Sequence, residues 1–225
     1  MRWLYAVFNL AIVAGPLAVT LVWFRDFWRH WRALLLSFFM ISLTWIVLDA
    51  ASHASGWWSY NQEFITGPRL IGLPLEELAF FFTVPFACMV VWHVLESRYK
   101  GRLPVAAPRW LLGAIIAACL VLAAVFADRQ RTLIDAGITV LTAVALWGTP
   151  LVRQKAWWYW NGVVILLFIV CNSVLTAAPV VVYNEPVMTG WRVGTIPFED
   201  FLYNFSLLNL VLLVYVRSRK LTDTQ

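Results

Sequence analysis

Charged side chains are scarce in this chain. Asp, Glu, Lys and Arg make up only 13% of its 225 residues, whereas hydrophobic residues make up 62%. A water-soluble domain of this length needs more polar surface to cover its core, so an ordinary soluble fold is excluded. The composition instead indicates a protein whose solvent is a lipid bilayer.

The usual signatures of a metal or nucleotide site are also missing from the sequence. The three cysteines show no C-x-x-C spacing, the three histidines form no H-x-x-x-H pair, and neither G-x-G-x-x-G nor a P-loop occurs. We therefore expect no metal and no nucleotide or flavin cofactor, so that any chemistry needs only protons. The basic residues lie in short clusters between apolar runs, which argues against nucleic acid as a partner.

Apolar runs of helical length recur along the whole chain. Each has close to the ~20 residues that a helix needs to cross a hydrocarbon core of about 30 Å, and their continuous apolarity favours helices over a β-barrel. The predicted fold is an all-α integral membrane protein with seven transmembrane helices. The runs cover residues 4–24, 33–50, 76–96, 110–127, 132–152, 158–178 and 199–216.

The connections between these runs carry an uneven share of basic residues. Twelve lie on the side of the C-terminus and five on the other side, where Arg129 and Arg131 are assigned to a connection. Because cytoplasmic loops are enriched in Lys and Arg, we expect the C-terminus in the cytoplasm and the N-terminus outside the cell membrane.

The chain resembles itself at an offset of 123 residues, which aligns two copies of the motif Y-N-x4-T-G-x-R-x4-P-x-E-[E/D]. The offset maps runs one to three onto runs five to seven and leaves the fourth as a connector, a 3+1+3 arrangement. The predicted parts are a first repeat, 1–103, with motif loop 57–77; a connecting span, 104–127; and a second repeat, 128–225, with motif loop 180–200. Because the connector restores the chain direction, these should be parallel repeats with both motif loops on the non-cytoplasmic side.

Each motif ends in a pair of acids at the start of an apolar run: Glu76 with Glu77, and Glu199 with Asp200. One interpretation is helix-start chemistry, because proline is favoured there and carboxylates complement the helix dipole by about 0.3–1 kcal/mol each. The rest of the motif favours a functional site, since a cap needs only the acids. The further polar residues kept in both copies are Arg69 and Arg192, Asn61 and Asn184, Tyr60 and Tyr183, and Thr66 and Thr189.

Two further groups are candidates for such a site. Asp49 and Asn172 occupy equivalent positions at the offset, within apolar surroundings where polar groups suggest function, although both could simply bond a neighbouring helix or loop. Aromatic rings follow the acidic pairs by about one helical turn, where their π faces could stabilise a cation or simply pack against other spans. They are Phe80, Phe81, Phe82, Tyr203 and Phe205.

Two stretches carry a family resemblance. Gly67–Phe82, GPRLIGLPLEELAFFF, and Gly190–Phe205, GWRVGTIPFEDFLYNF, resemble the two halves of the small, membrane-embedded lycopene cyclases of carotenoid biosynthesis, and the chain is similar to the fused form. The resemblance implies a cofactor-independent isomerisation that closes the ψ end groups of lycopene to β-rings, giving γ-carotene and β-carotene.

The resemblance also implies which groups act. Glu76, Glu77, Glu199 and Asp200 would be the catalytic acids. Our own hypothesis beyond the resemblance is that Glu76 and Glu199 are the main pair, that the motif arginines orient the basic carboxyl and keep it ionised, and that the motif asparagines tie down the loops. Lycopene, being wholly apolar, should enter sideways from the membrane lipid.

Other functions stay open at this point. A cyclase for fifty-carbon carotenoids, or a hydratase that adds water to the same end group, would begin with the same protonation. A proton-coupled transporter built from parallel repeats, with the acids as its proton relay, is the non-enzyme alternative.

Overall fold

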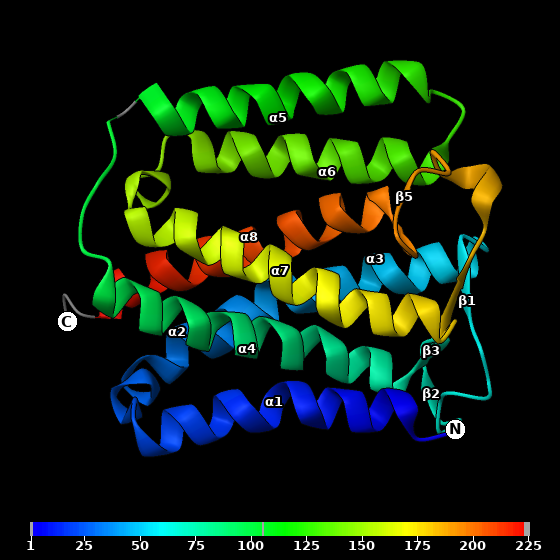
Figure 1. Ribbon diagram of the computed structural model, residues 1–225, viewed down its shortest axis with the longest axis horizontal. Coiled ribbons are helices and arrows are strands. Elements are labelled where there is room, and N and C mark those ends of the chain that lie inside the picture. Colours follow the sequence, from blue (N-terminus) through cyan, green and yellow to red (C-terminus); the bar gives the residue numbers. More distant parts are fainter. Residues whose placement is uncertain (1, 105, 223–225) are drawn as a thin grey trace. The chain divides into compact units, whose positions relative to one another are not determined.

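Long helices make up most of the computed structural model, which describes residues 2–104 and 106–222 (Figure 1). The second helical segment contains a π-helical stretch, Phe38–Ser42, between α2 (Trp31–Ser37) and α3 (Leu43–Ala54). The helical fold predicted from the apolar runs is confirmed. The α-helices are α1 (Leu4–Val22), α2 (Trp31–Ser37), α3 (Leu43–Ala54), α4 (Leu75–Arg98), α5 (Ala106–Val125), α6 (Gln130–Trp147), α7 (Lys155–Ala177) and α8 (Phe198–Thr222).

Six helical segments within the described residues are long and apolar enough to cross a membrane: 4–22, 25–54, 75–98, 108–125, 155–177 and 198–221. Helix α6 is not among them, because its first two turns carry Gln130, Arg131 and Asp135. The chain thus has several helices suited to a bilayer. The seventh span, the 3+1+3 arrangement and the orientation of the termini stay predictions.

The region around α6 departs from its predicted boundaries. The helix begins at Gln130 and ends at Trp147, because Gly148 and Pro150 interrupt it, and a short 3₁₀ turn, Leu151–Arg153, follows. The assignment of Arg131 to a connection is therefore wrong: it lies in the first turn of α6 and is buried.

Each motif folds into the same hairpin. In the first copy, β2 (Arg69–Leu70) pairs with β3 (Leu73–Pro74), and in the second, β5 (Arg192–Val193) pairs with β6 (Ile196–Pro197). The pairings Arg69↔Pro74 and Arg192↔Pro197 are equivalent at the offset of 123. Each hairpin leads directly into the helix that begins with the acidic pair (Figure 1).

A third strand pair joins the starts of the two motifs. Strand β1 (Trp58–Tyr60) runs antiparallel to β4 (Val181–Tyr183), with Trp58 opposite Tyr183 and Tyr60 opposite Val181. Since Tyr183 is the equivalent of Tyr60 and Val181 that of Trp58, the register is symmetric under the repeat, as in an isologous contact between identical subunits.

Contacts group the chain into two compact units. Unit 1 holds the residues up to Val94, Leu175–Tyr183 and the residues from Leu210 onward; unit 2 holds Leu95–Val174 and Asn184–Asn209. Glu76 and Glu77 therefore belong to unit 1, and Glu199 and Asp200 belong to unit 2. The units differ from the predicted repeats chiefly in assigning β4 and the end of α8 to unit 1.

Candidate active site

All four motif acids are buried in the first turns of α4 and α8. Glu199 is fully covered, and Glu76, Glu77 and Asp200 are 5%, 8% and 8% exposed. Acids that only complement a helix dipole can do so at the solvent-exposed surface, whereas burying a carboxyl group costs free energy unless specific partners bond to it. Helix capping alone therefore does not explain the burial of these four acids.

The first acid of each pair is held by its own motif. The backbone N–H of Thr66 donates to Glu76 Oε1 at 2.6 Å, and that of Thr189 donates to Glu199 Oε1 at 2.7 Å. In both residues the second oxygen, Oε2, is buried and has no hydrogen-bond partner within the described part of the chain. Each glutamate thus has one anchored oxygen and one available to a reacting group.

The helix that opens each repeat supplies a further polar contact. On α1, Asn9 Nδ2 donates to the backbone carbonyl of Glu76 at 3.1 Å, and on α6, Thr132 Oγ1 donates to Glu199 Oε1 at 2.6 Å. Asn9 and Thr132 are equivalent at the offset of 123, so the repeat already contained a signal for these two residues.

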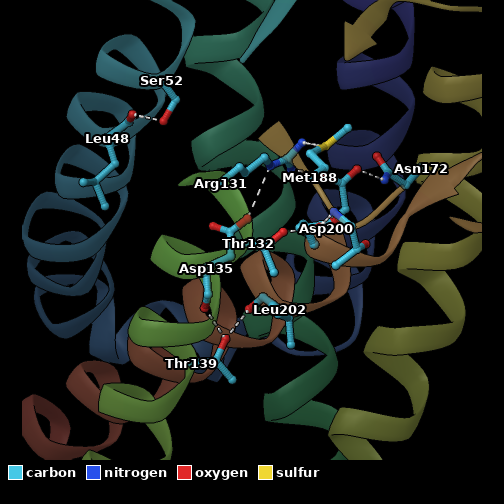
Figure 2. A network of polar contacts seen from close by, with 12 residues as sticks. Leu48, Ser52, Arg131, Thr132, Asp135, Thr139, Asn172, Met188, Asp200 and Leu202 are labelled. Atoms are coloured by element: carbon cyan, nitrogen blue, oxygen red, sulfur yellow. Dashed lines mark hydrogen bonds and ion pairs between the residues drawn. The ribbon is translucent and has the colours of Figure 1, made fainter. Parts of the chain in front are cut away.

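The second acid of each pair has a different kind of partner in each unit. In unit 1, the hydroxyl of Tyr5 donates to Glu77 Oε2 at 2.7 Å. In unit 2, the guanidinium of Arg131 pairs with Asp200 Oδ1, and Asn172 Nδ2 donates to Asp200 Oδ2 at 2.9 Å (Figure 2). The second acid of the first motif thus accepts from a neutral phenol, and that of the second motif pairs with a cation.

Arg131 is the centre of a buried network in unit 2 (Figure 2). Besides Asp200, it contacts Asp135 Oδ2 through Nε at 3.3 Å and Met188 Sδ through Nη1 at 3.1 Å. Thr139 Oγ1 then donates to the backbone carbonyl of Asp135 at 2.8 Å. Asp135 therefore shares a cation with a motif acid.

A second buried carboxyl cluster lies in unit 1. Tyr60 donates its hydroxyl to Asp49 Oδ2 at 3.0 Å and accepts from Trp58 Nε1 at 3.3 Å. Burial, followed by the negative charges of Glu77 and Asp49, raises the pKa of Tyr60 well above its ordinary value. Tyr60 therefore remains a neutral donor to Asp49.

The motif arginines bond to their own hairpins. Arg69 Nη1 donates to the carbonyl of Gly72 at 3.1 Å; Arg192 Nη1 donates to that of Thr195 at 2.7 Å and also pairs with Glu185. These contacts fix the hairpin loops. Arg131, from α6, supplies a guanidinium that pairs with a motif acid, Asp200.

The motif asparagines lie at the loop starts. Asn61 Oδ1 accepts from the N–H of Glu63 at 3.0 Å, and its own N–H donates to the carbonyl of Val180 at 3.0 Å. The carbonyl of Asn184 accepts from the N–H of Val187 at 3.3 Å.

The aromatic candidates divide by burial. Phe81 is only 1% exposed, Phe82 is exposed, and the ring of Phe80 lies 6.2 Å from that of Tyr5, the partner of Glu77. In unit 2, Tyr203 is half-buried. An aromatic ring thus lies beside the acid site of unit 1.

Comparison with known proteins identifies the family. The family model described as lycopene cyclase matches residues 2–95 and 128–217, which together are well over half of the chain and fall as one block in each predicted repeat. No match was found among curated proteins or among solved structures. The chain therefore belongs to the lycopene cyclase family, and its buried acid pairs are the candidate catalytic groups of a membrane-embedded carotenoid cyclase.

Proposed function

We propose that this protein is a lycopene β-cyclase, an isomerase that converts the ψ end groups of lycopene to β-rings and yields γ-carotene and then β-carotene without a cofactor. The observation that supports this most directly is the shared geometry of Glu76 and Glu199. Each has Oε1 anchored by a backbone N–H and Oε2 buried without a partner in the described residues.

The reaction requires one acid and one base. A carboxylic O–H transfers its proton to the terminal double bond of the end group, which leaves a carbocation. The π electrons of the neighbouring alkene attack it, so that a C–C bond closes the ring and the positive charge moves into the ring. A carboxylate then removes a proton from an adjacent ring carbon, whose C–H electrons become the ring double bond. One proton enters and one leaves, so the product has the mass of the substrate.

The open carboxyl oxygens suit this chemistry. A group that transfers a proton must come within hydrogen-bond reach of the reacting atom, and an oxygen already bonded to the protein is less free to do so. Glu77 and Asp200, the second acids of the two pairs, would assist Glu76 and Glu199 through their charge or by exchanging protons with them. Phe80 and Phe81 would offer ring faces to the cation.

An apolar substrate agrees with a protein embedded in a membrane. Lycopene is wholly apolar, and the six apolar helical segments give it a route from the lipid without passage through water. We assign the N-terminus to the outside of the cell membrane and the C-terminus to the cytoplasm from the excess of basic residues in the connections on the C-terminal side.

The test is a pair of single substitutions, Glu76→Gln and Glu199→Gln. Glutamine keeps the carbonyl oxygen that accepts from Thr66 or Thr189 but cannot donate or accept the catalytic proton. Each should lower conversion of lycopene by roughly 10²-fold or more, because general acid–base catalysis contributes about 10²–10⁴-fold. Pigments from a lycopene-accumulating host, and product formed by purified protein in detergent, are the measurements.

Glu63→Gln is the matched control, because Glu63 lies in the same loop but is exposed. It should leave conversion unchanged. Wild-type levels of β-carotene in both Gln variants would overturn the catalytic role of the glutamates. The mass of the product distinguishes cyclisation, which conserves mass, from hydration, which adds water. Supplying a fifty-carbon carotenoid tests whether the protein is a cyclase for that longer substrate. Conversion in detergent, where no gradient exists, argues against a transporter.

A further inference from the structure

The outer strand and turn of each motif hairpin expose apolar side chains. In both copies the inner strand, β3 or β6, is buried, whereas the outer strand, β2 or β5, is exposed. Leu70 and Ile71 in unit 1 are each more than half exposed, and so are Trp191 and Val193 in unit 2. Turns in contact with water are usually polar, so these exposed side chains indicate an apolar partner.

The turn of the first hairpin is unfavourable for an apolar, β-branched residue. Ile71 and Gly72 connect the paired residues Leu70 and Leu73, and both turn residues have a positive φ, 50° and 86°. Such two-residue turns favour Asn-Gly, Asp-Gly or Gly-Gly, and a β-branched residue is strained there. Among the residues that the structure describes, Ile71 is the only non-glycine residue with a positive φ. It therefore keeps a backbone strain that asparagine or glycine would relieve.

Packing within the protein does not explain this strain. The side chain of Ile71 is largely exposed, and the equivalent residue of the second copy is Gly194, with a φ of 63°. The hairpin therefore forms without a side chain at this position. Backbone strain that persists in a folded protein is concentrated where it serves a function. Since the strained side chain is apolar and exposed, that function is contact with an apolar partner.

The exposed surface of each hairpin is continuous with helices suited to a bilayer. Strand β3 leads into α4, an apolar segment long enough to cross a membrane, which exposes Leu75 in its first turn and Phe82 about two turns later on the same face. In unit 2, the ring of Trp191 lies 5.2 Å from that of Phe126, which directly follows the end of α5. Tryptophan at the end of an apolar helix is typical of the interface between lipid and water.

An arginine precedes the apolar residue of the outer strand in both copies. Arg69 precedes Leu70, and Arg192 precedes Val193. Arg69 Nη1 donates to the carbonyl of Gly72, so its exposed guanidinium lies at the turn. A guanidinium beside exposed apolar side chains suits the lipid headgroup region, because the apolar groups enter the acyl layer while the charge stays with the phosphates.

We propose that the tips of the two motif hairpins insert into the lipid interface of the membrane. The inserted side chains are Leu70 and Ile71 in unit 1, and Trp191 and Val193 in unit 2. Phospholipid acyl chains surround these side chains, and phosphates lie beside the motif arginines. Transfer of the Ile71 side chain from water into lipid offsets the strain of its backbone. The inference goes beyond the proposed reaction and does not depend on it, and each tip is tested by itself.

Fluorescent labels on single cysteines in reconstituted protein test the location of the tips. Cys88 and Cys119 are buried, so Cys171→Ser removes the native cysteine that is partly exposed. In that background, Ile71→Cys and Val193→Cys each carry an environment-sensitive label in phosphatidylcholine vesicles. Two quenchers are compared: a phospholipid with a nitroxide near the glycerol end of its acyl chain, and iodide in the water.

Both tip labels should lose fluorescence to the nitroxide lipid and keep it in iodide. Glu63→Cys is the matched control, because Glu63 is exposed in the loop before the first hairpin; its label should respond to iodide and not to the lipid. Quenching of the tips by iodide would overturn the proposal, since the tips would then lie in water. Protection of the tips from both quenchers would also overturn it, because protein would then cover them.

A second label position tests the part played by Ile71. Leu70→Cys places the label on the strand beside the turn, and Ile71→Asn is combined with it, because asparagine suits the turn but not the lipid. Ile71→Asn should lower the quenching of this label by the nitroxide lipid, whereas Ile71→Val, which is apolar and β-branched, should leave it unchanged. Equal quenching in the two combinations would contradict the insertion of Ile71.

Discussion

Replacing Arg131 by methionine should destabilise the protein more than replacing any exposed arginine. The guanidinium is buried and serves two buried carboxylates, Asp135 and Asp200, with Arg131 itself only 3% exposed. Removing one partner of a buried ion pair costs about 3–5 kcal/mol, because the remaining charge loses its counter-ion without regaining water. Since Arg131 bonds two buried carboxyl groups here, we expect the upper end, about 5 kcal/mol.

Thermal unfolding of the purified protein in detergent, followed by circular dichroism, measures this loss. For a chain of this size, each 1 kcal/mol lowers the melting temperature by about 2–4 °C, so Arg131→Met should melt on the order of 10 °C or more below wild type. Adding Asp200→Asn should recover part of the loss, because it removes one of the two stranded charges.

Arg69→Met is the control, since Arg69 is exposed and donates only a hairpin hydrogen bond to Gly72 among the contacts described. A contribution of about 1 kcal/mol or less is expected there. The reasoning fails if Arg131→Met melts within the range of this control, because the buried network would then carry no net stability.

Three smaller predictions concern the same parts of the chain. Ile71 has a positive φ of 50° where its repeat equivalent is Gly194 at 63°, so Ile71→Gly should raise stability by about 1 kcal/mol; a lower melting temperature would contradict the strain. Thr132→Val removes the hydroxyl that bonds Glu199 and should cost about 1–3 kcal/mol in unfolding experiments, whereas Thr142→Val, whose hydroxyl bonds its own helix at Ile138, should change little. Because the pKa of Tyr60 is raised, the folded protein keeps a proton that the unfolded chain releases near pH 10, so stability is full below about pH 10 and falls as the pH rises above it. Tyr60→Phe should therefore reduce the loss of melting temperature between about pH 9 and about pH 11, and an unchanged loss would contradict this.

Local features of the fold followed from the sequence. The two motifs have identical spacing, and the segments predicted only as loops fold into hairpins, β2–β3 and β5–β6, with equivalent registers. A short hairpin depends on contacts between residues only a few positions apart, so its pattern is visible in the sequence. The burial of the motif acids is also consistent with a function beyond helix capping.

The partners of those acids could not be predicted in the same way. Tyr5 lies 72 residues from Glu77, and Arg131 lies 69 residues from Asp200, so only the tertiary fold brings them together. Arg131 was predicted to lie in a connection because a charged residue lowers the hydropathy of its neighbourhood. Its burial is stabilised by Asp135, one helical turn later, and such i, i+4 spacing of opposite charges at the start of a helix was the available signal.

The duplicated chain has kept some contacts equal in both copies and changed others, and the difference separates two kinds of role. The anchoring of Glu76 by Thr66 and of Glu199 by Thr189 is the same to within 0.1 Å, so whatever these glutamates do requires the same local geometry twice. A dimer of identical chains would also give the second acids identical partners.

A single chain removes that constraint, because each copy can change independently. A phenol donates to Glu77 and a guanidinium pairs with Asp200, so the second acids of the two motifs lie in different electrostatic surroundings. The fused repeat thus supplies, in one folded chain, an asymmetry that a symmetric pair of subunits does not have.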